Sequence, residues 1–186
     1  MSTVIIVGNG STLLDKKNGS LIDEFDIVVR FNAYAIKGYE KNVGTKTTYW
    51  YNTINFQNIS GEHRVKVPYE RIVIHSWEWD PNKDKTYQNF LNHYKDSVDL
   101  RKTSKDLIEE IQTYISDKTY SAYSTGAMAI WMMLKEHPEV TITGFDWWST
   151  NKHHYSDNAP RGTLHKPAKE FAFINKLIQE GKVKIL

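Results

Sequence analysis

Short runs of β-branched and apolar residues alternate with segments of helical periodicity along this 186-residue chain. The first run, Thr3–Val7, ends at Gly8-Asn9-Gly10, which is typical of a turn after a strand. The other predicted strands are Asp26–Phe31, Thr47–Tyr51, Arg71–His75, Val140–Thr143 and Lys182–Leu186. The predicted helices are Lys85–Lys95, Ser104–Ile115 with Ser104 as N-cap, Thr125–Lys135, and Pro167–Glu180 with Gly181 at its end.

Strands that alternate with helices predict an α/β fold: one Rossmann-like domain over residues 1–186, with a mostly parallel sheet and helices on both faces. In such sheets, ligands bind beyond the carboxyl ends of the strands. Three unusual loops fall at that edge, namely Gly8–Leu14, Phe31–Tyr34 and Phe145–His165. We therefore expect any functional site to be built from these loops.

Composition excludes several classes of protein. A net charge of only +2 argues against wholesale nucleic-acid binding, and the absence of cysteine excludes disulfides and thiolate chemistry. No stretch approaches the roughly 20 apolar residues of a membrane-spanning helix, and the N-terminus lacks a signal-peptide pattern. The sequence predicts no transmembrane segment and a cytoplasmic location, with peripheral membrane association left open.

The loop Gly8–Ser11 follows a strand, and its glycines can bring backbone amides close to an anion. Leu13 departs from the G-x-G-x-x-G dinucleotide fingerprint, so a plain turn explains the loop equally well. Asn32, just beyond the second strand, is placed to read a base edge or a sugar hydroxyl, although a turn or cap asparagine is the simpler interpretation.

Ser124, Thr125 and Gly126 precede a long apolar helix. This places free backbone N–H groups and two hydroxyls at a helix N-terminus, which attracts negative charge. Ordinary capping by Ser or Thr gives the same pattern.

Histidines cluster late in the chain. A zinc site could be drawn from His154, Asp157 and His165, but the spacing matches no zinc motif, and no metal is predicted. His165 precedes Pro167, so we expect it in an exposed loop and free to titrate. Glu170, one turn into the helix, could hold local structure or favour the protonated imidazole.

Taken in order, these segments resemble the animal-type sialyltransferases, glycosyltransferase family 29. VIIVGNGSTLL…LIDEFDIVVRFNAY…NVGTKTTYWY is similar to the large motif of that family, and YSTGAMAIWMML…EVTITGF to its small motif. HYSD at His154–Asp157 is similar to the third motif, and His165-x-x-x-x-Glu170 to the very small motif. Together the four cover roughly half of the chain.

The resemblance implies a GT-A-like variant of the fold and metal-independent, inverting transfer of sialic acid from CMP-sialic acid to a glycan acceptor. It implies His165 as the general base and His154 at the leaving phosphate. Residues implied at the CMP donor are Asn9, Gly10, Ser11, Asn32, Ser124, Thr125, Gly126, Gly144 and Phe145. Trp147, Trp148 and Tyr155 are candidates for stacking on the acceptor sugar, with partial burial under a lid as the alternative.

The resemblance is to a minimal form of the animal enzymes: we expect no anchor or stem, and the sequence has no cysteines for their disulfide. Ser156 also replaces an expected aromatic residue, which leaves Kdo open as the donor sugar. Two other classes remain open: an enzyme using another nucleotide sugar, and a non-catalytic nucleotide- or glycan-binding module.

Overall fold

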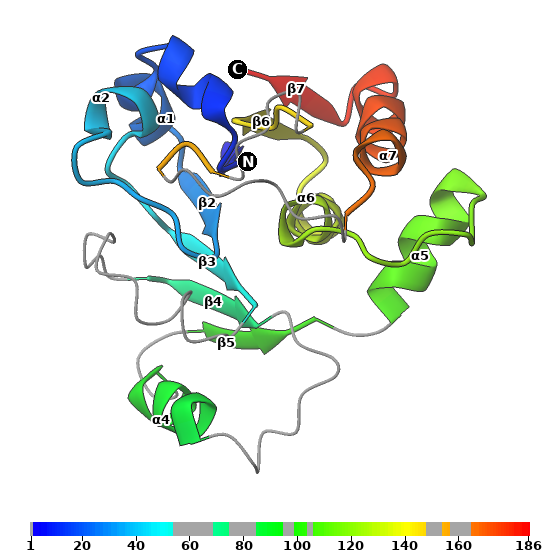
Figure 1. The fold of residues 1–186 in the computed structure, drawn as a ribbon, viewed down its shortest axis with the longest axis horizontal. Helices are drawn as coiled ribbons and strands as arrows, with labels where there is room; N and C mark the ends of the chain where they lie inside the picture. Colours follow the sequence, from blue (N-terminus) through cyan, green and yellow to red (C-terminus); the bar gives the residue numbers. More distant parts are fainter. Residues whose placement is uncertain are drawn as a thin grey trace.

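The computed structural model describes residues 2–53, 69–74, 85–94, 99–103, 106–147, 154–156 and 165–186. Seven strands form one sheet in the order β5-β4-β3-β2-β1-β6-β7 (Figure 1). They are β1 (Val4–Val7), β2 (Ile27–Phe31), β3 (Tyr49–Asn52), β4 (Arg71–Ile74), β5 (Asp99–Lys102), β6 (Val140–Thr143) and β7 (Val183–Ile185). Every neighbouring pair is parallel, which confirms the predicted class.

Helices cover both faces of the sheet, as predicted (Figure 1). One face carries α5 (Asp106–Ile115), α6 (Thr125–Glu136) and α7 (Pro167–Gln179), and the other carries α1 (Gly19–Asp23), α2 (Glu40–Val43) and α4 (Lys85–Tyr94). Strand side chains alternate between the two cores: Val4 and Ile6 belong to the first, Ile5 and Val7 to the second. Strand β1 is apolar throughout because both of its faces are buried.

The predicted elements start and end within two residues of those observed wherever the structure describes them. Gly181 follows α7 with a φ of +72°, the left-handed conformation that ends many helices. Ser104, His75 and Lys95 lie outside the described residues. Among these described parts of the chain, no helix is both long and apolar enough to cross a bilayer.

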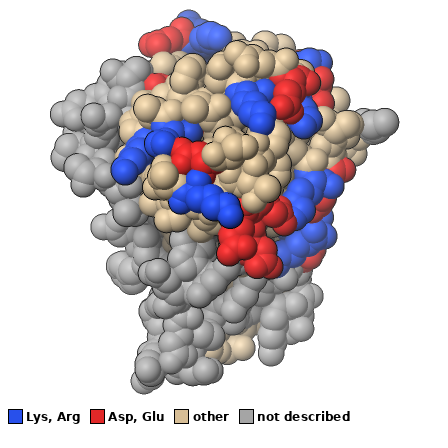
Figure 2. All heavy atoms as spheres, turned by 90° about the vertical axis from the view of Figure 1, so that its right-hand side faces the viewer, with Lys and Arg blue, Asp and Glu red and all other residues tan. Residues whose placement is uncertain are grey.

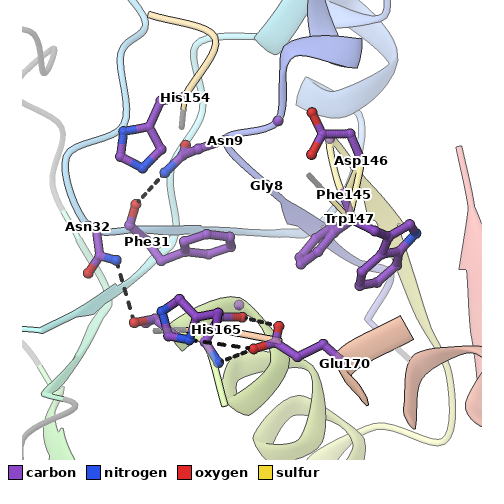
Figure 3. A pocket seen from close by; sticks show the side chains of 15 residues that line it. Gly8, Asn9, Phe31, Asn32, Phe145, Asp146, Trp147, His154, His165 and Glu170 are labelled. Atoms are coloured by element: carbon purple, nitrogen blue, oxygen red, sulfur yellow. Dashed lines mark hydrogen bonds and ion pairs between the residues drawn. The ribbon is translucent and has the colours of Figure 1, made fainter. Parts of the chain in front are cut away.

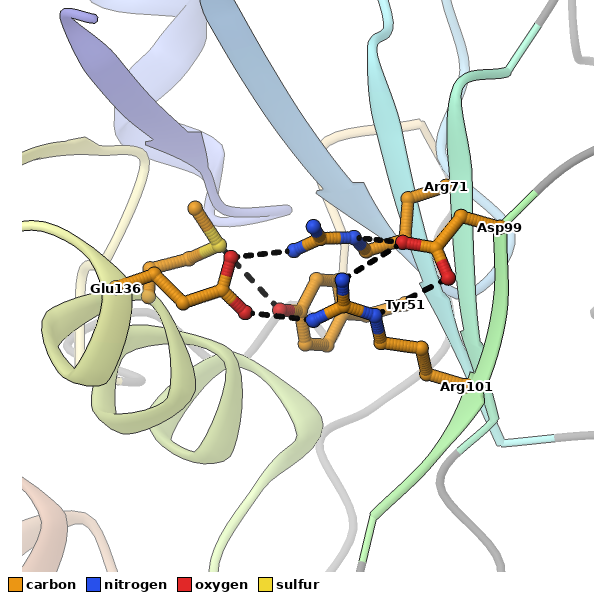
Figure 4. Close-up of polar contacts among 6 residues, drawn as sticks. Tyr51, Arg71, Asp99, Arg101 and Glu136 are labelled. Atoms are coloured by element: carbon orange, nitrogen blue, oxygen red, sulfur yellow. Dashed lines mark hydrogen bonds and ion pairs between the residues drawn. The ribbon is translucent and has the colours of Figure 1, made fainter.

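The edge strand β5 was not predicted. Its Asp99 accepts hydrogen bonds from Arg71 of β4 at 2.8 Å and from Arg101 at 3.1 Å. Both arginines also bind Glu136, the last residue of α6, at 2.8 and 2.9 Å (Figure 4). The guanidinium of Arg71 lies 4.4 Å from the ring centre of Tyr49. The network ties the sheet edge to α6.

Arg71 and Arg101 share partners but differ in burial, with 10% and 42% of the side chain exposed. We expect Arg71→Met to lower the unfolding free energy by about 2 kcal/mol, because it leaves two carboxylates short of a buried partner. Arg101→Met should cost less than about 1 kcal/mol, as for an exposed ion pair. Urea denaturation of the two variants measures this difference, and equal losses would contradict it.

Positive and negative side chains are interspersed on the face that carries α5 and α7 (Figure 2). Lys135 pairs with Glu110 at 2.7 Å and Lys169 with Asp117 at 2.5 Å. The described part of this face therefore carries mixed charge.

The chain changes direction across the sheet at β1. From β1 it proceeds strand by strand to β5, and it then crosses back to place β6 on the other side of β1. The carboxyl ends of β1 and β6 thus lie at a topological switch point, where doubly wound sheets bind ligands.

Candidate active site

A pocket of about 110 Å³ opens at this switch point (Figure 3). Most residues predicted at a site line it, namely Asn9, Gly10, Asn32, Ser124, Thr125, Gly126, Gly144, Phe145, Trp147, His154 and His165. Glu170 also lines it, together with Gly8, Phe31 and Asp146, which lie in the loops expected at this edge but were not singled out as site residues. Each of these three is next to a predicted residue in the sequence, so adjacency to the motifs was the available signal.

The glycine loop packs against the end of β6. Gly8 and Gly10 donate their N–H groups to backbone carbonyls there, at 2.7 and 2.8 Å. A Cβ on Gly8 would lie 2.2 Å from the carbonyl oxygen of Gly144. The N–H of Ser11 donates to Asp146 at 3.0 Å, and Ser11 does not line the pocket. These glycines therefore permit close backbone contact, as in the plain-turn interpretation of the loop.

Two asparagines at the pocket follow the neighbouring strands β1 and β2. Asn9 donates through Nδ2 to the carbonyl of Phe31 at 3.2 Å, while its buried Oδ1 has no partner. Asn32 has a φ of +53°, and its Oδ1 accepts from the N–H and hydroxyl of Thr53, both at 3.0 Å. Its Nδ2 reaches Thr125 Oγ1 at 3.4 Å. Asn32 thus joins β2, β3 and α6, whereas Asn9 presents an unused acceptor.

The N-terminus of α6 forms one wall of the pocket. Ser124 caps this helix and accepts from Ala127 N–H at 3.2 Å, as predicted for an N-cap. A Cβ on Gly126 would lie 2.8 Å from the Phe145 ring and 2.9 Å from the Phe31 ring. The glycine therefore lets two aromatic rings approach the first turn, where helix amides attract anions.

Glu170 of α7 is buried directly behind this cap. Its carboxylate accepts from the N–H of Ser124 at 2.7 Å and from the Ser124 hydroxyl at 2.6 Å (Figure 3). The Tyr120 hydroxyl lies 3.1 Å from the same carboxylate. Burial raises the pKa of Glu170, and the hydrogen bonds from Ser124 and the charge of His165 oppose that rise. Glu170 of α7 therefore binds the N-cap residue of α6 and joins the two helices.

His165 is more restrained than the sequence predicted. Its side chain is 30% exposed, and its Nδ1 lies 2.6 Å from the carbonyl oxygen of Ala122. A carbonyl can only accept, so we assign the proton to Nδ1, which leaves Nε2 as the nitrogen that can act as a base. Nδ1 also lies 3.7 Å from Glu170 Oε1. His165 precedes α7 and is partly exposed, as expected, but it is held by a hydrogen bond rather than free of contacts.

His154 is held beside the glycine loop by its neighbour. Tyr155 N–H donates to the Asn9 carbonyl at 2.8 Å, and the Tyr155 hydroxyl bonds both the N–H and the carbonyl of Ala35. The Tyr155 ring is 4% exposed and meets Tyr39 edge-on. The ring therefore anchors His154, and its placement does not favour the predicted contact with an acceptor sugar.

Trp147 lines the pocket and carries strain. Its φ is +52°, which is unusual for a bulky residue, and its ring lies 5.7 Å from Phe145 and 5.6 Å from Phe171. Trp148, the other predicted stacking residue, lies outside the described residues, as does Asp157.

The described pocket lining has few ionisable groups: two acids, Asp146 and Glu170, and two histidines, His154 and His165. No Lys or Arg is among these lining residues. In the part of the chain that the structure describes, no cluster of three His, Asp or Glu could hold a metal ion.

A parallel sheet whose switch point carries a pocket, lined by a helix N-terminus and two histidines, defines a doubly wound α/β protein. The family model for glycosyltransferase family 29 (sialyltransferase) matches residues 1–182. The chain belongs to this family.

Individual relatives agree with that assignment. A CMP-N-acetylneuraminate-β-1,4-galactoside α-2,3-sialyltransferase of Rattus norvegicus is 59% identical over 87% of this chain and 46% of its own length. A β-1,6-galactosyltransferase of Arabidopsis thaliana is 26% identical over 82% of this chain and 44% of its own length. The crystal structure of a mammalian sialyltransferase is 19% identical with a TM-score of 0.72, covering 100% of this chain and 68% of that one. The chain spans about half the length of the curated relatives it matches.

Proposed function

We propose that this chain transfers sialic acid, or a related sugar acid such as Kdo, from a CMP-linked donor to a glycan hydroxyl. The observation that carries the proposal is the convergence of the four family motifs on one pocket, with Asn9, Ser124, His154 and His165 in its lining. The 59% identity to a sialyltransferase supports the choice of donor.

The donor would be held mainly by uncharged groups. Its phosphate and sugar carboxylate are anions, and the amides at the N-terminus of α6 beside Thr125 and Gly126 attract negative charge. The buried Oδ1 of Asn9 can accept from a ribose hydroxyl or a base amine, which would give this atom the partner it lacks. Phe145 offers a ring face to the nucleoside or sugar.

The chemistry follows from the two histidines. Nε2 of His165 would remove the proton of the acceptor hydroxyl while the hydroxyl oxygen forms its bond to the anomeric carbon. The anomeric carbon–phosphate oxygen bond breaks in the same step, and a hydrogen bond or proton from His154 stabilises the departing CMP. Attack opposite the leaving group inverts the anomeric centre. Because CMP already leaves as a stable phosphate monoester, we propose that no metal is required.

Trp147 is our candidate for stacking on the acceptor sugar, because it reaches the pocket from a strained backbone. We retain Trp148 and Tyr155 as weaker candidates, the latter because of its burial. The glycan and the linkage are not assigned.

Thermal unfolding with saturating CMP, UDP and GDP tests the donor assignment. We expect CMP to raise Tm by about 5–10 °C, since ligand at 100 times its Kd contributes about 2.7 kcal/mol. Asn9→Ala should lose most of this shift. Asn42→Ala is the matched control, because Asn42 also bonds backbone carbonyls but on α2, away from the pocket. A larger shift with UDP would contradict the CMP assignment and favour the chemistry of a galactosyltransferase.

Turnover is tested separately with labelled CMP-sialic acid and lactose, followed by a panel of other glycans. Transfer to any of them supports the enzyme. A clear CMP shift without product from any acceptor would favour a nucleotide-binding module.

A further inference from the structure

We propose that Tyr120 is a positioning residue that fixes the tautomer and orientation of His165. This inference rests on the proposed role of His165 as the base. Tyr120 does not line the pocket and touches no reacting group, so it acts only through its neighbours.

The Tyr120 hydroxyl is buried among the groups that hold His165. Its oxygen lies 2.6 Å from the Ala122 carbonyl oxygen and 3.1 Å from Glu170 Oε1, and it accepts the N–H of Lys166 at 3.1 Å. The Ala122 carbonyl is also the partner of His165 Nδ1, at 2.6 Å. Lys166 follows His165 in the chain. The Tyr120 hydroxyl therefore contacts three groups around His165: the carbonyl to which its Nδ1 bonds, the N–H of the next residue, and the carboxylate near its ring.

The role of Tyr120 depends on which neighbour accepts the proton of its hydroxyl. A phenol has one proton, and the Lys166 N–H already supplies a donor to its oxygen. The Tyr120 proton therefore points to Ala122 or Glu170, and the 2.6 Å distance favours the Ala122 carbonyl. That carbonyl then accepts from both Tyr120 and His165. Tyr120 keeps it in place while His165 gains and loses its second proton at Nε2.

The chain supplies a matched control three residues away. Tyr123 packs against Tyr120 with ring centres 4.8 Å apart, and the two residues are 2% and 3% exposed. The Tyr123 hydroxyl is buried without a hydrogen-bond partner. Removal of the Tyr120 hydroxyl thus removes its hydrogen bonds around His165, whereas removal of the Tyr123 hydroxyl removes no hydrogen bond.

The test is the tautomer of His165, read by nitrogen-15 NMR of histidine-labelled protein and assigned with His165→Gln. Wild type and Tyr123→Phe should show the proton on Nδ1. In Tyr120→Phe a substantial share of the ring should carry it on Nε2. With labelled CMP-sialic acid and an acceptor, kcat of Tyr120→Phe should fall about 10-fold, because the base is misplaced, while KM for the donor stays within about two-fold.

Identical tautomers and kcat in the two phenylalanine variants would overturn the proposal. Wild type offers a check that needs no variant: Tyr120 Hη and His165 Hδ1 donate to one oxygen, so a nuclear Overhauser effect should connect them. Its absence would overturn the proposal even if Tyr120→Phe failed to fold. NMR requires no turnover, so a tautomer change in a protein without transfer activity would refute the proposed function and leave the positioning role supported.

Discussion

Replacement of His165 by alanine should lower kcat about 1,000-fold while leaving the affinity for CMP within about two-fold of wild type. The imidazole is the group in the pocket whose Nδ1 is fixed by a backbone carbonyl, so that Nε2 is left to accept a proton. Its loss removes proton abstraction and leaves the N-terminus of α6 and Asn9 in place. The measurement is single-turnover transfer together with CMP titration calorimetry.

His137→Ala is the control, since His137 follows α6 at its other end, away from the pocket. It should retain wild-type kcat and CMP affinity. Near-normal turnover of His165→Ala would refute the base assignment. A parallel loss of CMP binding would indicate that His165 acts on the donor instead.

Under the proposed function, the anionic groups of the donor would meet few charged side chains in the described lining. The described lining has no Lys or Arg, so the proposed partners of these groups are the amides at the N-terminus of α6 and a hydrogen bond from His154. Helix-terminus attraction is worth about 0.3–1 kcal/mol, much less than a buried ion pair costs to break. Under the proposed function, the described lining would hold product CMP without a permanent cation. Two acids, Asp146 and Glu170, are instead occupied by Ser11 and Ser124, which keeps their charge from facing the ligand alone.

Much of the fold could be predicted because apolar strands buried on both faces leave a plain sequence signal. The strand β5 could not, since Asp99 and Arg101 of its sequence DLRK serve ion pairs at a sheet edge. Its place depends on Arg71 and Glu136, which lie far away in the sequence.

The candidate site could likewise be predicted only in part. Its residue types could be read from the ordered motifs, but their local roles could not. The glycines at 8 and 10 resemble an anion loop, yet their function is set by the backbone at Gly144. The burial of Tyr155 likewise depends on Ala35 and Tyr39, which no local pattern reveals.

Glu170 should be the residue whose loss most weakens the site as a structure. Glu170→Ala strands the N–H and hydroxyl of Ser124 in a buried position, and we expect a loss of about 3 kcal/mol in unfolding free energy. Glu170→Gln keeps the shape and one acceptor, so it should lose about half as much. Activity should fall in both, because the helix cap and the support of His165 move together. Urea denaturation and turnover measure the two effects.

The pH dependence of the unfolding free energy separates the effect of ionising Glu170 from the effect of its side-chain shape. Because burial raises its pKa in the folded state, Glu170 stabilises the fold most below the ordinary carboxyl pKa, and this contribution is lost as pH rises through the folded pKa. The stability advantage of wild type over Glu170→Gln should therefore shrink as the pH rises above about 4. Glu139→Gln, at an exposed pair with Lys184, should show no such trend. An advantage that grows with pH would mean that the hydrogen bonds from Ser124 outweigh burial and hold Glu170 as a carboxylate.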